Sequence, residues 1–341
     1  MYRLDHLKLK NILINVFQNI GLCSSSINHV VESMIETSLR GIDSHGINLF
    51  PHYYRAVKSG RVNSKPQFEI TSQNSSTAII NANHAFGHHS GSKAIEIAIK
   101  LAENSGIGAV SVNNSTHFGA AGYFALQASR KNFLAFSFTN ADSLVRVTNT
   151  KESYFGTNPI CFTAPMEGEE PLCLDMATSI VSWNKILNAR IENSNLEKGL
   201  AVDIKGKSCI DPNQAAMLEA IGTYKGYGLG MMVEILCGMI SNGPIGREIL
   251  PMFTSPIEEK RKISHFFIVI DLGSFISVKS FKMRLKNMAD EIRSLGDNIF
   301  IPGDPEKVEF KDRIVSGIPI EKAKYEEFVK INKDFETTIV S

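Results

Sequence analysis

The chain has 341 residues, of which 43% are hydrophobic and 21% are charged, and its formal net charge is +1. A near-neutral balance with scattered basic residues gives no electrostatic reason to expect nucleic acid or an anionic membrane as a partner. The length exceeds what one small core needs, so two domains, or one core with a large insertion, are expected.

The cysteines predict a reducing environment. They are odd in number, far apart and form no CxxC pair, which disfavours a disulfide framework or a thiolate zinc site. The N-terminal stretch 1–18 is interrupted by charges and lacks the apolar run of a signal peptide or membrane span. A cytoplasmic protein with buried thiols fits best. The cysteines are Cys23, Cys161, Cys173, Cys209 and Cys237.

Hydrophobic periodicity and turn residues predict an α/β chain. In chain order the predicted elements are helices over 4–20 and 24–35, two short strands within 68–83, a helix over 90–106, a strand over 107–112, a helix over 122–132 and a strand over 133–140. There follow paired strands over 161–165 and 172–176, a helix from about 178, a helix over 224–240, a strand over 265–271, a helix over 278–295 and a charged helix after Pro319. This alternation predicts a layered α/β core. The loop 241–262, rich in Gly, Pro and charge, is the best candidate for a mobile flap.

Two histidines lie in loops where ligands could bind. His45 sits in "GIDSHGINLF", and His117 lies between a strand end and a helix start in "NSTHFG". Such junctions often carry ligand sites in α/β proteins, and imidazole exchanges protons near neutral pH. Each histidine could equally be a capping or hydrogen-bonding group, and local sequence alone favours that interpretation.

The remaining histidines suggest a metal site at most weakly. His84 and His88 are four residues apart and His89 follows, a spacing that could place ligands on one helical face. Gly87 weakens that helix, and no HExxH motif or fixed carboxylate accompanies it. A metal-dependent hydrolase or lyase is therefore a minority hypothesis. His265 opens an apolar strand and is predicted to be structural.

A standard dinucleotide-binding fingerprint is missing. "SGIGAV" lacks the third glycine of GxGxxG, and the glycines of "GYGLG" fall inside a predicted helix. If a dinucleotide binds, its phosphates need other donors. The helix start expected after Asp175, at Thr178 or Ser179, is one candidate, and Lys225 is another, although a solvated surface lysine is equally compatible with its position.

Seven motifs together resemble the malate/L-lactate dehydrogenase family, and the resemblance extends from about residue 4 to residue 335. That family includes sulfolactate and ureidoglycolate dehydrogenases, diketogulonate reductase and cyclic imino acid reductase. In order, the motifs are "GIDSHGINLFPHYYRAVKSGRVN", "VNNSTHFGAAGYFALQASRKN", "FGTNPICFTAP", "LDMATS", "AVDIKGKSCIDP", "YKGYGLGMMVEILCGM" and "FIPGDPE".

The resemblance implies an oxidoreductase that uses NAD or NADP to interconvert a small 2-hydroxy acid and its 2-oxo acid. It also implies a layered mixed-sheet core, a non-Rossmann cofactor-binding domain over 116–295, and a second domain built from both chain ends, 1–115 and 296–341. Family members are homodimers. A cyclic imino acid reductase using NADPH is the nearest alternative, and a catalytically inactive relative that only binds a nucleotide is a further one.

The resemblance also implies roles for individual residues. His117 and His45 would carry the proton and Asp142 would orient the base, while Ser44 and Asn48 would lie on the substrate side. The positions that match cofactor-contacting segments are Asp175, Met176, Ala177, Lys225, Gly226, Gly303, Asp304 and Glu306.

One departure concerns the substrate. Many members carry an arginine three or four residues after the loop histidine, but this chain has Asn48 and Leu49 there. The carboxylate of a 2-oxo acid needs a counter-charge, which a bidentate arginine supplies best. Either the substrate lacks that carboxylate or another cation replaces the arginine, and Arg146 and Arg55 are the candidates.

Overall fold

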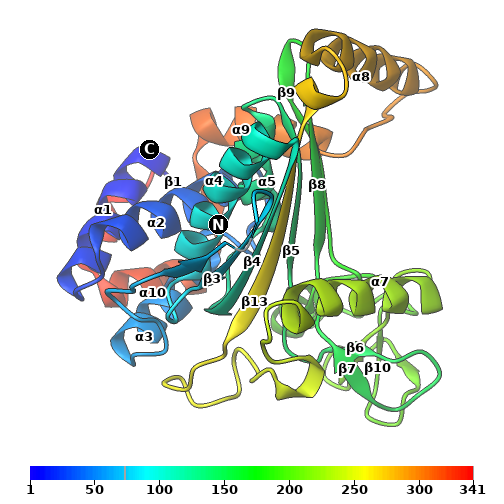
Figure 1. Ribbon diagram of the computed structural model, residues 1–341. Coiled ribbons are helices and arrows are strands. Elements are labelled where there is room, and N and C mark those ends of the chain that lie inside the picture. Colours follow the sequence, from blue (N-terminus) through cyan, green and yellow to red (C-terminus); the bar gives the residue numbers. More distant parts are fainter. Residues whose placement is uncertain (73, 341) are drawn as a thin grey trace.

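The centre of the molecule is a mixed seven-stranded sheet (Figure 1). The computed structural model describes residues 1–72 and 74–340. In sheet order the strands are β2 (Glu69–Thr71), β3 (Thr77–Asn81), β4 (Ile107–Ser115), β13 (Ile263–Asp271), β5 (Phe133–Thr139), β8 (Ile160–Met166) and β9 (Glu169–Met176). β3 and β4 pair in parallel and all other neighbours are antiparallel.

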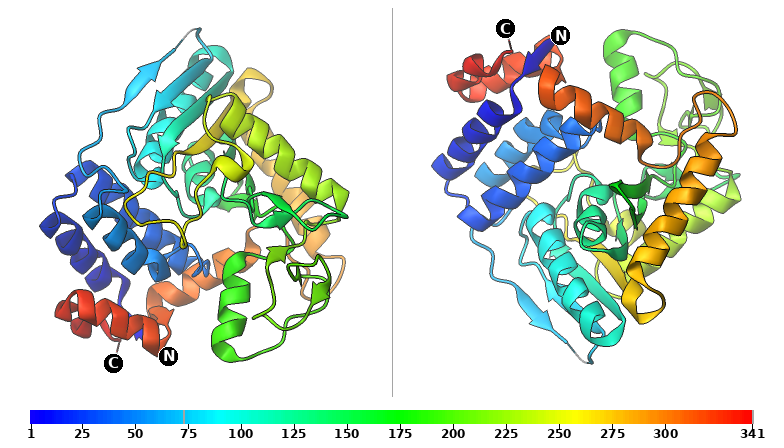
Figure 2. Two further views of the ribbon diagram at one scale, coloured as in Figure 1. Left: turned by 90° about the horizontal axis from the view of Figure 1, so that it is seen from below. Right: turned by 90° about the horizontal axis from the view of Figure 1, so that it is seen from above.

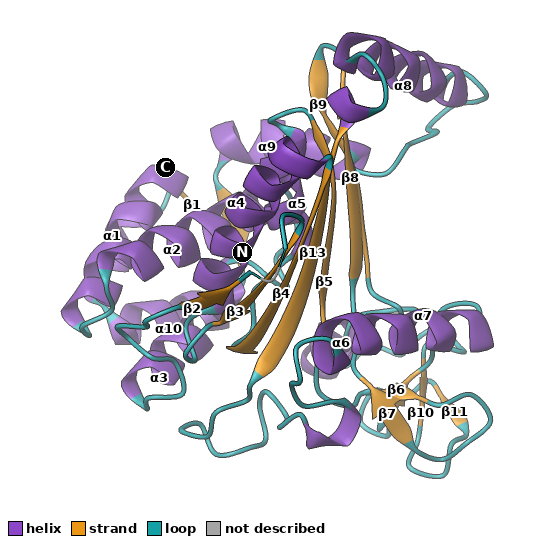
Figure 3. Cartoon of the chain, viewed as in Figure 1, coloured by secondary structure: helices purple, strands orange, loops and turns teal. Residues whose placement is uncertain are grey.

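Helices cover both faces of this sheet (Figure 3). One face packs on α4 (Gly87–Ser105) and α5 (Ala121–Ser129), through an alanine-rich interface. Gly108 allows the close approach, because a Cβ there would lie 2.1 Å from the carbonyl oxygen of Ala98 in α4. The other face packs on α7 (Tyr224–Glu234) and the short helix η2 (Ile235–Met239), so the core is layered.

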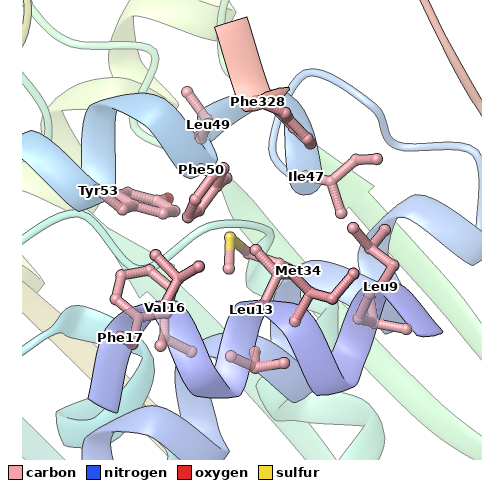
Figure 4. Packing of buried hydrophobic residues seen from close by; sticks show 14 of the residues in the cluster. Leu9, Leu13, Val16, Phe17, Met34, Ile47, Leu49, Phe50, Tyr53 and Phe328 are labelled. Atoms are coloured by element: carbon pink, nitrogen blue, oxygen red, sulfur yellow. The ribbon is translucent and has the colours of Figure 1, made fainter. Parts of the chain in front are cut away.

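A helical part made from both chain ends lies beside the sheet, and the two termini are adjacent (Figure 2). Phe50 joins its helices: its ring is 5.8 Å from Phe17 and 5.1 Å from Phe328 (Figure 4). Burial of such aromatic side chains is the main stabilising term here. The elements are β1 (Tyr2–Leu4), α1 (His6–Asn19), α2 (Ser24–Leu39), η1 (Ile47–Leu49), α3 (Phe50–Lys58), α9 (Asp304–Ser316), β14 (Ile318–Ile320), α10 (Lys322–Ile331) and η5 (Lys333–Thr338).

Smaller elements complete the fold. A second sheet has the strand order β11 (Ser208–Cys209), β10 (Ala201–Val202), β12 (Met217–Leu218), β6 (Val145–Arg146) and β7 (Ser153–Phe155), and it packs with α6 (Trp183–Glu192). The remaining helices are η3 (Gly246–Glu248), η4 (Leu272–Ser274) and α8 (Val278–Arg293). α8 lies at the end of the long β8–β9 hairpin, away from the helical part (Figure 1).

The predicted order of helices and strands is confirmed, with one displaced start. The helix expected from about Thr178 begins at Trp183 instead. Thr178 donates its backbone N–H to the carbonyl of Thr157 at 2.8 Å, and Ser179 bridges to Ala220. Those backbone groups are therefore already used, and no open helix N-terminus faces an anion at Thr178.

The large sheet is continuous across residue 115. β4 ends at Ser115 and pairs along its length with β13. The expected division into 1–115 with 296–341 and 116–295 thus runs through one sheet, although the helices from both chain ends do share one core. Within the described residues, no helix is both long and apolar enough to span a membrane.

Candidate active site

Two histidines far apart in the sequence lie face to face beside the sheet. The rings of His45 and His117 are 5.7 Å apart between centroids, with their planes inclined by 27°. His45 follows α2, and its loop packs against the end of that helix because Ile47 donates its backbone N–H to Ser38 Oγ at 2.8 Å. His117 lies between β4 and α5. The fold therefore gathers the two predicted proton carriers into one place.

Each ring is held through its Nδ1 atom. Ser44 Oγ lies 2.8 Å from Nδ1 of His45, and the Tyr53 hydroxyl lies 2.8 Å from Nδ1 of His117. In the described part of the chain, Nε2 of neither ring has a hydrogen-bond partner. Nε2 is therefore the atom that each histidine can offer to a substrate.

Asp142 does not occupy the expected place beside His117. Its carboxylate accepts a hydrogen bond from Arg261 Nη2 at 2.5 Å and a long one, 3.4 Å, from the backbone of Met252. Arg261 is only 3% exposed and Asp142 13%, so this ion pair is buried. Among the described residues, the Tyr53 hydroxyl, and no carboxylate, bonds the histidine ring.

The surroundings keep both histidines neutral. Burial, followed by unfavourable electrostatic interaction with His45 when it is protonated and with Arg261, lowers the pKa of His117 well below its usual value. Burial lowers the pKa of His45 to about 4. Desolvation and neighbouring positive charge both oppose protonation, and two stacked imidazoles oppose double protonation. Arg261 supplies the positive charge here that would favour an anionic ligand.

The cations proposed to replace the missing arginine are engaged elsewhere. Arg146 lies in β6, where its Nε donates to Glu219 at 3.2 Å in a half-buried ion pair. Arg55 is exposed and pairs with Glu327 at 2.8 Å. Arg261, whose charge acts on His117, is the buried arginine next to the histidine pair. Asn48 has a buried amide oxygen without a hydrogen-bond partner among the described residues.

The loop 241–262, predicted to be a mobile flap, is tied to the helical part in this structure. The fully buried Arg61 donates to the backbone oxygens of Met252 at 2.9 Å and Pro256 at 2.7 Å. In the opposite direction, the ammonium group of Lys260 donates a hydrogen bond to the carbonyl of Gly60. Because these contacts anchor the loop on both sides of its tip, they also fix the position of Arg261.

The residues expected to contact the cofactor form two groups. Asp175 and Glu306 line one small cavity with Gly122, whose N–H donates to Asp175 at 2.6 Å; burial raises the pKa of Asp175 to about 6. Met176 and Ala177 follow Asp175 and are half-buried, and Gly303 approaches β9, where a Cβ would lie 3.0 Å from the nitrogen of Cys173. Asp304 is instead bound to Arg293 at 2.6 Å and 2.8 Å.

The second group lies at the start of α7. Lys225 is exposed and forms no ion pair with the described residues. Gly226 is required there, because a Cβ would lie 2.1 Å from the carbonyl oxygen of Ile221. A free ammonium at one place and half-buried carboxylates at the other suit the phosphates and the ribose hydroxyls of a dinucleotide. The residues present therefore fit such a group.

The histidines of the metal hypothesis do not converge. His89 bonds to Ser25 and Ser26, each at 2.9 Å, whereas His88 is fully buried against Tyr53 with a ring centroid distance of 5.1 Å. His84 lies before α4 with a positive φ of 59°. Over residues 1–72 and 74–340, no group of three or more metal-ligating side chains was found. The minority hypothesis has no ligand set in this part of the chain.

Residues 4–329 match the sequence model of the malate/L-lactate dehydrogenase family. The chain belongs to this family. A malate/(S)-sulfolactate dehydrogenase of Methanothermus fervidus is 31% identical over 324 residues, which cover 94% of this chain and 95% of the relative. The protein is thus a dehydrogenase acting on CH–OH groups of hydroxy acids.

Solved structures agree. Malate dehydrogenase from Entamoeba histolytica superposes with a TM-score of 0.92 at 27% identity, covering 98% of each chain. Delta1-piperideine-2-carboxylate reductase from Pseudomonas syringae superposes with a TM-score of 0.88 at 25% identity, covering 97% of this chain and 100% of the reductase. The same fold therefore carries both a hydroxy-acid dehydrogenase and a cyclic imino acid reductase.

Sequence reasoning did not single out Tyr53, Arg261 or Arg61. Tyr53 lies eight residues after His45 on the buried face of α3, and a buried tyrosine hydroxyl needs a partner. Arg261 lies in the basic run 260–262, two residues before the buried strand β13, and such a run is ordinarily exposed. The first signal could have marked Tyr53, whereas the burial of Arg261 and Arg61 has no local signature.

Proposed function

We propose that the protein interconverts a small 2-hydroxy acid and its 2-oxo acid at the His45–His117 pair, with Arg261 binding the substrate carboxylate. The observation that carries this proposal is the stacked pair of neutral histidines beside a buried arginine. His117 and His45 exchange the proton at the substrate oxygen through Nε2. The cofactor is NAD or NADP, which takes or gives the hydride when bound.

Arg261 is suited to the role that the missing arginine would have played. Its Nη2 is bonded to Asp142 and its Nε to the carbonyl of Leu250 at 2.7 Å, while Nη1 has no partner in the described part of the chain. A guanidinium has five N–H donors, so it can hold Asp142 and a substrate carboxylate together. Asp142 is thereby a positioning residue for Arg261. Ser44 and Asn48 lie in the same segment as His45, between α2 and α3, and would complete the substrate side.

The cofactor segments are assigned from the family match and from the groups that they offer. Lys225 and Gly226 would bind the phosphates, and Asp175, Met176, Ala177, Gly303 and Glu306 would line the nucleoside side. Asp304 would support this side through Arg293. The substrate site then lies between the helical part formed by both chain ends and the sheet.

A homodimer in the cytoplasm is part of the proposal. Several apolar side chains of α7, of η2 and at its C-cap are more than a third exposed, which is typical of an association surface. The five cysteines are unpaired, as suits a reducing compartment. Analytical ultracentrifugation would give the mass of the particle, and a monomer would contradict the dimer. The exposed side chains are Leu229, Met231, Met232, Ile235, Met239 and Ile240.

The first test measures the oxidation of NADH and of NADPH, in separate assays, by the 2-oxo acids that correspond to malate, lactate and sulfolactate. Turnover of at least one 2-oxo acid with one of the two cofactors is expected. A cyclic 2-imino acid should be assayed beside them, because the structural similarity to the piperideine-carboxylate reductase favours it as the second candidate. Turnover of the imino acid alone would replace the main proposal, and turnover of none would reject both.

A further inference from the structure

We propose that Tyr53 is the positioning residue of His117 and that it fixes the proton of the resting neutral ring on Nε2. The proposal rests on the role assigned to His117 above. The Tyr53 hydroxyl lies 2.8 Å from Nδ1 of His117, at the place where the carboxylate of Asp142 was expected. Tyr53 bonds the base itself, so it acts through the orientation and protonation of the ring.

The tautomer follows from the donors around Nδ1. The backbone N–H of Gly119 points at Nδ1 of His117 at 3.4 Å, in addition to the Tyr53 hydroxyl. A backbone N–H can only donate, so this long contact favours the tautomer in which Nδ1 presents its lone pair, and the shorter Tyr53 contact holds that tautomer. In the neutral ring the proton is then on Nε2, which is the nitrogen without a partner in the described part of the chain.

Tyr53 is itself held rigidly. It is 2% exposed in α3, and its ring packs edge-on against Phe86 at 5.5 Å and His88 at 5.1 Å. Burial raises the pKa of Tyr53, so the hydroxyl keeps its proton and can donate it to Nδ1. Among the described residues, His117 is its hydrogen-bond partner. In the resting site a rigidly held hydroxyl therefore donates to Nδ1 of a rigidly held ring.

The packing around His117 supports the same geometry. Gly119 has a φ of +76°, and a Cβ there would lie 2.9 Å from Nε2 of His88. Only glycine lets the backbone turn back so that its N–H meets Nδ1. Gly119, two residues after His117, thus positions its N–H for the ring, and no side chain of the described residues, including that of His117, caps α5.

The chemical consequence is a resting site arranged for a 2-oxo acid. With the proton on Nε2, the neutral ring donates a hydrogen bond to the substrate carbonyl oxygen. Transfer of that proton to the product oxygen requires Nδ1 to take up a proton that comes from solvent, which leaves the ring neutral with its proton on Nδ1. A hydroxy acid needs the opposite tautomer, with Nδ1 protonated and the Tyr53 oxygen as acceptor. A phenol can donate or accept, whereas a carboxylate would only accept and would stabilise the charged ring.

The test compares Tyr53→Phe with the neighbouring Tyr54→Phe, which removes a hydroxyl that bonds neither histidine. Nitrogen-15 NMR of histidine-labelled protein at neutral pH, with His117→Gln to assign the signal, should show Nδ1 unprotonated and Nε2 protonated. Tyr53→Phe should give a mixture of tautomers and lower kcat by roughly 10- to 100-fold, with cofactor binding unchanged. Tyr54→Phe should behave as the native protein.

A proton on Nδ1 in the native protein would overturn the proposal, as would Tyr53→Phe with native tautomer and native kcat. If Tyr53→Phe does not fold, the spectrum of the native protein still decides the tautomer. The two proposals fail separately. Absence of turnover with every 2-oxo acid would reject the function, while the NMR signal would still report how Tyr53 holds the ring.

Discussion

His117 and His265 show how differently one fold uses the same side chain. The ring of His265 is stacked 4.6 Å from Phe118, the residue next to His117, and both of its nitrogens bond to hydroxyls at 2.8 Å, Thr139 and Ser115. His117 has one nitrogen bonded and the other available. Both nitrogens of His265 are occupied by buried hydroxyls, so this histidine is structural, whereas His117 keeps one nitrogen that can act on a ligand.

His88 sharpens this distinction. Neither of its nitrogens has a partner among the described residues, yet the side chain is completely buried. Burial lowers its pKa to about 3, and no substrate can reach it. A nitrogen without a partner is therefore not enough; it must also be accessible, as Nε2 of the half-buried His117 is.

Removal of the working histidine should give the largest effect. His117→Gln is expected to lower kcat by about 10²- to 10⁴-fold, because the proton is no longer transferred by a positioned group. The affinity for NADH or NADPH, measured by nicotinamide fluorescence, should be retained. If kcat were native in this variant, the assignment of the two histidines would have to be reversed, and His45→Gln would be the next variant.

The substrate arginine should give the next effect. Arg261→Leu combined with Asp142→Asn, which avoids a stranded buried charge, should raise KM for the 2-oxo acid by roughly 10- to 100-fold. Arg146→Leu is the matched control, because its ion pair with Glu219 belongs to the small sheet. It should lower thermal stability and leave KM unchanged. The reverse pattern in steady-state kinetics would return Arg146 to the site.

Substitution of the structural histidine, His265, should change the stability of the protein and not its catalysis. Burial lowers the pKa of His265 to about 3, so the unfolded chain binds a proton below pH 6.5 and the folded protein does not. Stability should therefore fall as the pH is lowered from 6.5 towards 3. His265→Gln should reduce this slope by up to about 1.4 kcal/mol per pH unit, measured by urea unfolding. An unchanged slope would show that His265 is protonated in the native state.

Sequence patterns predicted most of the secondary structure because the period of the apolar residues reports which face of an element is buried. The helix expected from Thr178 started later because its backbone is captured by Thr157 and Ala220, which are distant in sequence. The two histidines were predicted as candidates from their loops. The expectation that Asp142 orients His117 did not hold in this structure. Asp142 pairs with Arg261 instead, and the Tyr53 hydroxyl bonds the ring.

By itself, the sequence determined the family, the α/β class, the missing Rossmann fingerprint and the loss of the arginine after His45. The tertiary structure decided that Tyr53 bonds His117 across 64 residues and that Arg261 meets Asp142 across 119 residues. It also decided that Arg146 is neutralised by Glu219. Local patterns report burial and turn geometry, whereas the partner of a polar side chain depends on which distant segments the packed core brings within hydrogen-bond distance.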